Sequence, residues 1–320
     1  MEVIKIRHPH CPEIHEPIVL VLGFFDGVHR GHQAVIQTAR DIAQERGLKL
    51  ALMTFNQHPK IVYSRMKPEE MDYLSDYERK MALFEEQGVD LVFLVDFTYP
   101  FGAQSPEAFV ERYIVGLNAQ VAVAGFDYTY GLKEVANMTT LPTHAAGRFE
   151  VIEVPKQVIY QDKIGSTSIR ELIQTSQIDE ANEALGYVYE TNGVVVHGEK
   201  RGRTIGFPTA NIRTRSGQLQ PGVGIYTVEL KVGNDWYQGM ASIGYNVTFD
   251  TETGLTVEVN IFDFSEMIYG EEVTVRWHHY LRGEVKFDGI DGLIAQLQQD
   301  KANSLAYFEQ LEATANLIEG

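Results

Sequence analysis

Short runs of apolar residues alternate with amphipathic segments through the first half of the chain. The runs at 18–22, 50–55, 91–95 and 121–124 are apolar at nearly every position, which is typical of parallel strands buried on both faces. The segments between them carry helical signals. Strands that alternate with helices predict a parallel sheet with right-handed crossovers, and ligands of such sheets bind beyond the carboxyl ends of the strands.

Capping residues indicate where these helices begin and end. Serine or aspartate before a helix, and glycine after it, satisfy the backbone groups that have no partner inside the helix. The expected helices are 32–46 with Gly47 as C-cap, one opened by a Ser75 and Glu78 capping box and ended by Gly88, one opened by Ser105-Pro106-Glu107, and 178–185 ended by Gly186.

The pattern changes near residue 186. Beyond it, strand-like segments follow one another without helices between them, which predicts an antiparallel sheet or a small barrel. A helical segment over 290–317 is expected to close the chain. We therefore expect two domains, 1–185 and 186–320. The expected strands of the second are 193–197, 226–232, 236–243, 256–262 and 272–277, with turns at 233–235 and 253–254.

Composition excludes several classes of protein. Apolar residues make up 44% and charged residues 22% of the chain, as in ordinary folded proteins. The lone cysteine, Cys11, excludes an intrachain disulfide and a multi-cysteine zinc site, and fits a reducing cytoplasm. A net charge of −17 argues against nucleic acid as a partner. Because no apolar run is long enough to span a bilayer and the N-terminus lacks a signal-peptide core, we expect a cytoplasmic protein without a membrane partner. The oligomeric state stays open.

The most informative motif is Gly-Phe-Phe-Asp-Gly-Val-His-Arg-Gly-His at 23–32. It joins the first apolar run to the first predicted helix, and a glycine-rich turn in that position binds nucleotide phosphates. His29 and His32 can donate hydrogen bonds to charge that develops on a phosphate. The plain alternative is that the two histidines only cap the helix. The candidate phosphate-binding residues here are Gly23, Phe24, Asp26, Gly27 and Gly31.

A second phosphate-binding segment is expected where Ser166 and Thr167 begin a helix. Arg170 follows within about one turn. Hydroxyl groups and an arginine at a helix start suit a phosphate. The alternative is an ordinary N-cap beside a surface arginine.

The second half has its own candidate site. Thr209 and Asn211 fall on one face of an extended segment, where a hydroxyl and an amide offer oxygen ligands to a Mg²⁺ that ATP phosphates also hold. In the predicted strand 256–262, alternation gives Glu258 a fixed position from which it can take a proton from a hydroxyl. Glu258 is alternatively just the exposed residue of a half-buried strand. Gly202, Arg203 and Gly206 are the candidate phosphate-binding residues of this half.

Taken together, the two motifs resemble the prokaryotic bifunctional riboflavin kinase/FAD synthetase family over nearly the whole chain. The resemblance implies an N-terminal Rossmann-like nucleotidyltransferase sheet and a C-terminal small antiparallel β-barrel with a terminal helix. It implies that MgATP phosphorylates riboflavin to FMN, and that FMN and a second ATP give FAD and pyrophosphate. The resemblance makes Glu258 the general base, Thr209 and Asn211 the Mg²⁺ ligands, His29 and His32 catalytic, Ser166, Thr167 and Arg170 phosphate-binding, and His58, Asp127, Asn246 and Arg282 flavin-binding.

The chain departs from the family pattern where flavins or phosphates are expected to bind. These departures leave two alternatives: an FMN adenylyltransferase with a silent kinase-like domain, or a flavin-binding sensor. The departures are Gln57 before His58-Pro59, Thr129 in the segment 127–131, Gly165 and Ser168 around Ser166 and Thr167, Val247, and Gly283 after Arg282.

Overall fold

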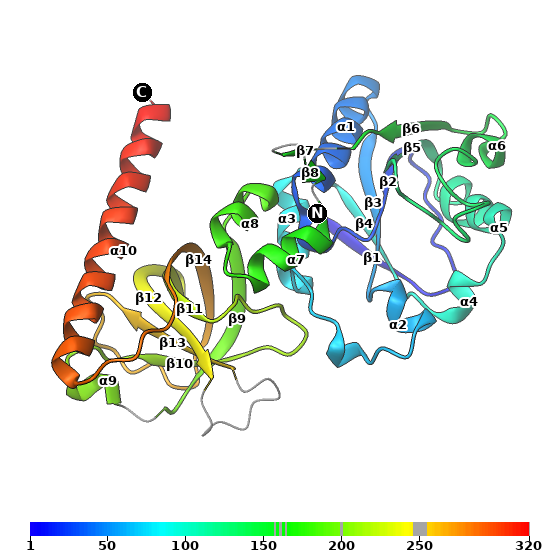
Figure 1. Ribbon diagram of the computed structural model, residues 1–320. Helices are drawn as coiled ribbons and strands as arrows, with labels where there is room; N and C mark the ends of the chain where they lie inside the picture. The colour runs from blue at the N-terminus through cyan, green and yellow to red at the C-terminus, as the bar shows by residue number, and fades with distance from the viewer. Residues whose placement is uncertain (157, 160–161, 164, 199–200, 246–254, 320) are drawn as a thin grey trace. The chain divides into compact units, whose positions relative to one another are not determined.

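The chain forms two compact units, Met1–Ser168 and Ile169–Gly320 (Figure 1). The computed structural model describes residues 1–319 except 157, 160–161, 164, 199–200 and 246–254. The units divide earlier in the chain than the expected domain limit at 185/186, because the helix before that limit packs against strands of the second unit. The limits of the functional domains therefore stay a prediction.

The first unit is built on a parallel sheet, as predicted, with the strand order β1-β4-β3-β2-β5-β6. The four apolar runs form its inner strands. The two edge strands, β1 and β6, have charged residues at their first and fourth positions and were not expected from the pattern. The strands are β1 (Glu2–Ile6), β2 (Ile18–Leu22), β3 (Lys49–Phe55), β4 (Leu91–Val95), β5 (Ala119–Gly125) and β6 (Glu150–Val154), with a separate antiparallel pair, β7 (Val158–Ile159) and β8 (Asp162–Lys163).

Helices cover both faces of this sheet. The first predicted helix ends at Gly47 as expected, and Ser105 caps α5 by accepting a hydrogen bond from the Ala108 N–H. The helical elements are η1 (Asp26–Val28), α1 (Arg30–Arg46), α2 (Pro59–Tyr63), η2 (Pro68–Glu70), α3 (Tyr77–Glu86), α4 (Tyr99–Gly102), α5 (Pro106–Val110), a π-helical turn η3 (Glu111–Val115) and α6 (Leu141–Ala145).

The expected capping box at Ser75 is wrong. Asp76 caps α3, because its carboxylate accepts a hydrogen bond of 2.8 Å from the Arg79 N–H. The Ser75 hydroxyl is engaged elsewhere and accepts a hydrogen bond from the Gly27 N–H at 3.1 Å. A serine one residue before the cap therefore ties α3 to the glycine-rich turn.

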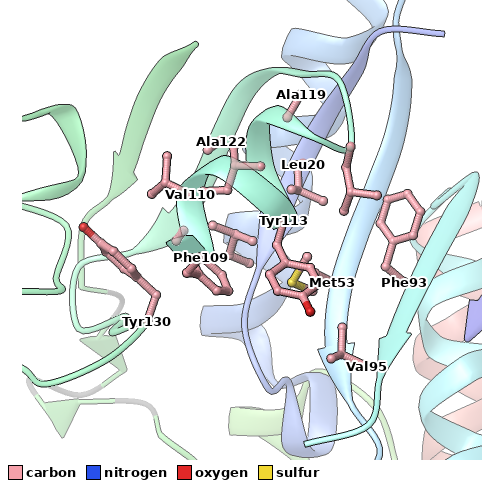
Figure 2. Close-up of a cluster of buried hydrophobic side chains, with 14 of the residues drawn as sticks. Leu20, Met53, Phe93, Val95, Phe109, Val110, Tyr113, Ala119, Ala122 and Tyr130 are labelled. Carbon is pink, nitrogen blue, oxygen red and sulfur yellow. The ribbon is translucent and has the colours of Figure 1, made fainter. Parts of the chain in front are cut away.

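A cluster of buried side chains fills the space between the sheet and α5–η3. In Figure 2, Phe109 and Tyr113 meet Leu20 and Met53 from the central strands. Tyr113 is fully buried. The opposite face of the same strands packs against α1. Packing on both faces fixes the strand ends, from which the candidate site residues extend.

The second unit is a closed antiparallel barrel with the strand order β10-β13-β12-β11-β14-β9. Its hairpin at Gly233-Asn234 is as predicted, since Val232 pairs with Asp235; the expected turn at 253–254 lies outside the described residues. Its first helix, α7 (Ser166–Gln174), begins in the last residues of the first unit. The other elements are α8 (Ile178–Leu185), β9 (Tyr189–Val196), α9 (Arg201–Thr204), β10 (Ala210–Thr214), β11 (Gly224–Val232), β12 (Asp235–Tyr245), β13 (Leu255–Ile261), β14 (Glu272–Arg282) and the terminal helix α10 (Ile290–Glu319).

Both tryptophans of the chain belong to this barrel. Trp277 is fully buried, and its indole N–H donates a hydrogen bond of 2.9 Å to the Thr191 hydroxyl. Trp236 lies under the Arg276 guanidinium, 3.7 Å from its ring centroid. Among the described residues, none of the helices is both long and apolar enough to cross a membrane.

Candidate active sites

The glycine-rich motif lies at the carboxyl ends of β2 and β3. Phe25 (φ 57°) and Gly27 (φ 74°) adopt left-handed conformations there, and the Thr54 hydroxyl donates a hydrogen bond of 2.8 Å to the Phe24 carbonyl. A Cβ at position 23 would overlap the Phe25 ring, so this close turn requires glycine. The predicted position of the motif is confirmed.

Asp26 holds this turn in place. Its carboxylate is buried and accepts hydrogen bonds from the N–H groups of Leu74 at 3.0 Å and Ser75 at 3.4 Å. The Ser166 hydroxyl donates to the Asp26 carbonyl at 3.1 Å. The two expected phosphate-binding segments of the first half are therefore brought together, and the contact of Asp26 itself with phosphate stays a prediction.

The two histidines stack on each other, with ring centroids 3.6 Å apart. His29 is buried and caps α1, since its Nδ1 accepts a hydrogen bond from the His32 N–H at 3.3 Å. His32 Nδ1 is shielded from solvent and has no hydrogen-bond partner among the described residues. Burial, and then the neighbouring His29 and Lys80, lower the pKa of His32 well below its ordinary value. His32 is therefore neutral at pH 7. His29 has two contacts: it caps α1, and its ring stacks on the ring of His32.

Residues of the expected flavin site lie near the same edge of the sheet. His58 caps α2 and packs edge-on against Phe24, with centroids 4.9 Å apart. Asp127 is exposed and follows β5, the parallel neighbour of β2. Three residues further along the chain, the Tyr130 hydroxyl bonds to His144 Nδ1 at 2.6 Å. Of the second phosphate segment, Ser166 and Thr167 begin α7.

Sequence reasoning missed one buried cation in this unit. Lys80 of α3 is only 7% exposed, and its Nζ lies 4.6 Å from the centroid of the Phe24 ring. Burial lowers the pKa of Lys80 to about 8, although Asp26 opposes that shift. The signal in the sequence was a lysine four residues before Phe84, which places it on the apolar stripe of the helix.

This lysine makes the stability of the first unit depend on pH. The pKa is about 8 in the fold and 10.5 ordinarily, so the unfolded chain binds more protons between these values and stability rises with pH, by up to about 1.4 kcal/mol per pH unit. Followed by circular dichroism, the first unit is expected to melt at a higher temperature at pH 9 than at pH 7.5. Lys80→Met is expected to be the more stable protein at pH 7.5 and to lose that advantage toward pH 9. An advantage that does not change with pH would contradict the assignment.

In the barrel, the structure brings the predicted kinase residues together. Asn211 of β10 pairs directly with Glu258 of β13. The Thr209 hydroxyl donates a hydrogen bond of 3.2 Å to the half-buried Glu258 carboxylate. Glu258 is therefore more than an exposed residue of a half-buried strand: its carboxylate bonds to one candidate metal ligand, and its backbone pairs with the other.

Two cavities meet at Thr209, and β13 runs between them. Its residues alternate, so that Glu258 and Asn260 line the smaller cavity, about 160 Å³, whereas Val259 and Ile261 line the larger, about 450 Å³. Thr209 lines both. The candidate Gly202 lines the smaller cavity and Arg203 the larger, while Gly206 (φ 86°) borders a third cavity beside them. The smaller cavity also has Ile205, Phe207, Ile225, Met240, Ala241, Ser242 and Leu297 in its wall.

Arg282 has a different observed partner from the one expected. Its guanidinium pairs with the buried Asp300 of α10 through bonds of 2.9 and 2.6 Å. Asp300 lies one turn beyond Leu297, so this pair holds α10 where it closes the smaller cavity. A contact of Arg282 with flavin stays a prediction, and the expected flavin residue Asn246 lies outside the described residues.

These observations fit a two-module, nucleotide-dependent transferase, with one candidate site on a parallel sheet and one in a barrel. A family model for FAD synthetase matches residues 11–168, and one for riboflavin kinase matches 185–308. The bifunctional riboflavin kinase/FMN adenylyltransferase of Listeria monocytogenes is 48% identical over 98% of this chain and all of its own length. The enzyme of the same name from Bacillus subtilis is 42% identical over 97% of this chain and 99% of its own.

The same fold occurs in a solved structure. A crystal structure described as a macrolide-efflux protein from Streptococcus pneumoniae matches with a TM-score of 0.86 and 37% identity, over 95% of this chain and 99% of that one. The chain belongs to the bifunctional riboflavin kinase/FMN adenylyltransferase family. The family resemblance is thus confirmed, and the protein is an enzyme of flavin biosynthesis that carries both modules.

Proposed function

We propose that the barrel phosphorylates riboflavin at the junction of its two cavities. The observation that carries this proposal is the contact between Thr209 and Glu258 on the wall that the cavities share. ATP occupies the larger cavity beside Arg203, and riboflavin approaches from the smaller, mostly apolar one. The γ-phosphate and the 5′-hydroxyl then meet beside Glu258, which takes the hydroxyl proton as the oxygen bonds to the γ-phosphorus. The bond from that phosphorus to the bridging oxygen breaks, and ADP leaves with its electron pair.

The donor set at and beside this junction fits Mg²⁺. Thr209 lines both cavities, whereas Asn211 lines neither and pairs with Glu258 in the adjoining strands. A threonine hydroxyl and an asparagine amide oxygen are hard neutral ligands, and phosphate oxygens of ATP complete such a site. Thr209 and Asn211 would hold the ion, which supplies charge neutralisation for the phosphates. Asn211 is nearly buried, and its side chain packs against the Gly198 backbone, so its position is fixed before any ligand binds.

That packing predicts the effect of one added methyl group. Gly198→Ala is expected to lower kcat/KM for MgATP in riboflavin phosphorylation at least about tenfold, because its Cβ would overlap the Asn211 amide and displacing one ligand costs about 1.4 kcal/mol or more. Gly289→Ala, where a Cβ meets no atom within 4 Å, is the matched control. Equal kcat/KM values for the two variants would show that Asn211 is not a ligand of the metal.

In the first unit, we propose that FMN is adenylylated at the motif after β2. An oxygen of the FMN phosphate bonds to the α-phosphorus of ATP, and pyrophosphate leaves. His29 and His32 donate hydrogen bonds to the charge that grows on that phosphate. Ser166, Thr167 and Arg170 hold the other phosphates, while His58 and Asp127 contact the flavin.

Two parallel assays test the whole proposal. One contains protein, MgATP and riboflavin, the other protein, MgATP and FMN, and the products are separated by chromatography. We expect FMN in the first and FAD in the second, and no FMN from riboflavin after chelation of Mg²⁺. FAD without FMN formation would mean a silent kinase module, and flavin binding without any product would favour a sensor.

The lone Cys11 and the net charge of −17 support a cytoplasmic enzyme that acts on riboflavin, FMN and ATP rather than on nucleic acids.

A further inference from the structure

A buried ammonium group lies behind the two histidines of the first site. Lys80 Nζ reaches the carboxyl ends of β2 and β3, 3.4 Å from the Phe24 carbonyl oxygen and 3.5 Å from that of Phe55. These bonds are long, since N–H···O distances cluster near about 2.9–3.0 Å. In the described part of the chain Lys80 forms no ion pair. An ammonium has three donors, so this one has capacity for a stronger acceptor.

The groups that face Lys80 offset the cost of burying its charge only in part. Asp26 acts on it electrostatically, but the Asp26 carboxylate already accepts two backbone N–H groups. His32 faces it from α1, with His29 stacked behind. The turn after β2 and the last residue of β3 present carbonyl oxygens. Burying a cation without a close counter-ion costs stability, and an anion bound at this edge of the sheet would supply the missing charge.

We infer that Lys80 binds the phosphate chain of ATP in the FMN adenylyltransferase site. This inference deepens the function proposed for the site and rests on it. As the FMN oxygen bonds to the α-phosphorus, the bond from that phosphorus to the bridging oxygen breaks, and pyrophosphate leaves with its electron pair. Lys80 stays protonated throughout and contributes one positive charge to the phosphate chain, beside the hydrogen bonds of the histidines.

A purely structural role leads to different expectations. If Lys80 only tied the ends of β2 and β3 together, its replacement would lower the melting temperature of the unit and leave the affinity for phosphates unchanged. An anion-binding role predicts the reverse: a protein that is as stable or more stable, and that binds the phosphate chain poorly.

Three variants separate these roles. Lys80→Met removes the charge and keeps the length of the side chain, and Lys80→Arg keeps the charge. Lys49→Met makes the same chemical change at the exposed, opposite end of β3. For each full-length protein we would measure kcat/KM for ATP in FAD formation and binding of inorganic pyrophosphate by calorimetry. Melting followed by circular dichroism is the control of folding of the first unit, and riboflavin phosphorylation is the control of the barrel.

We expect Lys80→Met to lose about 10- to 100-fold in kcat/KM for ATP and in pyrophosphate affinity, with riboflavin phosphorylation unchanged. Lys80→Arg should keep most of both, and Lys49→Met all of both. In the wild type, pyrophosphate affinity and kcat/KM should fall above about pH 8, where Lys80 loses its proton. Lys80→Arg should lack this decline, because arginine stays charged.

Unchanged pyrophosphate affinity in Lys80→Met would overturn the inference. So would equal pH profiles of the wild type and Lys80→Arg, a comparison that decides the matter even if the methionine variant does not fold. Because pyrophosphate binding is measured separately from FAD formation, the test of Lys80 can fail or succeed independently of the proposed function. A protein that binds pyrophosphate through Lys80 but makes no FAD would support the contact and contradict the adenylyltransferase assignment.

Discussion

Replacing Glu258 with glutamine is expected to slow riboflavin phosphorylation by about 10²- to 10⁴-fold, the usual contribution of a general base. Glutamine has nearly the same shape, and its amide oxygen can still accept the hydrogen bond from the Thr209 hydroxyl. The site geometry is therefore kept and the basicity is lost. The measurement is the rate of FMN formation from riboflavin at saturating MgATP, resolved by chromatography.

FAD formation from FMN by the same Glu258→Gln protein should be unchanged, because it takes place in the other unit. Glu272→Gln is the matched control, since Glu272 is an exposed strand glutamate of the same barrel. If the two variants phosphorylate riboflavin at equal rates, Glu258 is not the base. The smaller cavity would then have to provide another proton acceptor.

His29→Asn is expected to slow FAD formation by about 10²- to 10³-fold, the cost of removing a hydrogen-bond donor that stabilises developing charge. Asparagine is among the best N-caps, so it replaces the bond that His29 Nδ1 accepts from the His32 N–H and removes only the imidazole. FAD formation from FMN and MgATP is the measurement, and riboflavin phosphorylation is the internal control.

The comparison with His29→Ala separates chemistry from capping. Alanine removes both the imidazole and the cap, so this variant should lose the same activity and, in addition, about 1 kcal/mol of helix stability. If asparagine restores the rate of FAD formation and alanine does not, His29 serves only as a cap, and the plain alternative for this motif is correct.

The fold was predictable wherever burial is uniform along an element. The four inner strands of the sheet are apolar at nearly every position because helices cover both of their faces, whereas β1 and β6 are edge strands whose charged residues interrupt the apolar pattern. Strand alternation likewise predicted the side of β13 on which Glu258 lies. The positions of the two candidate sites in the fold were predictable because each gathers its residues within a short segment or on one strand face.

What the sequence pattern missed depends on contacts between distant residues. Ser75 precedes a helix and looks like its cap, but its hydroxyl bonds to Gly27, 48 positions away. The contact of Arg282 with flavin stays a prediction, but its pairing with Asp300 was not expected, because only the fold brings these two residues together. Lys80 has the sequence context of an ordinary helical lysine, and only the packing of α3 against the glycine-rich turn buries it. None of these three contacts has a local sequence signature.

The location of the two tryptophans has a practical consequence for spectroscopy. Trp236 and Trp277 both belong to the barrel, so intrinsic tryptophan fluorescence reports on the kinase module alone. A fluorescence melting curve of the whole protein will therefore register unfolding of the barrel and be silent on the parallel sheet. Any difference between that curve and one followed by circular dichroism belongs to the adenylyltransferase module, whose unfolding can be isolated without cutting the chain.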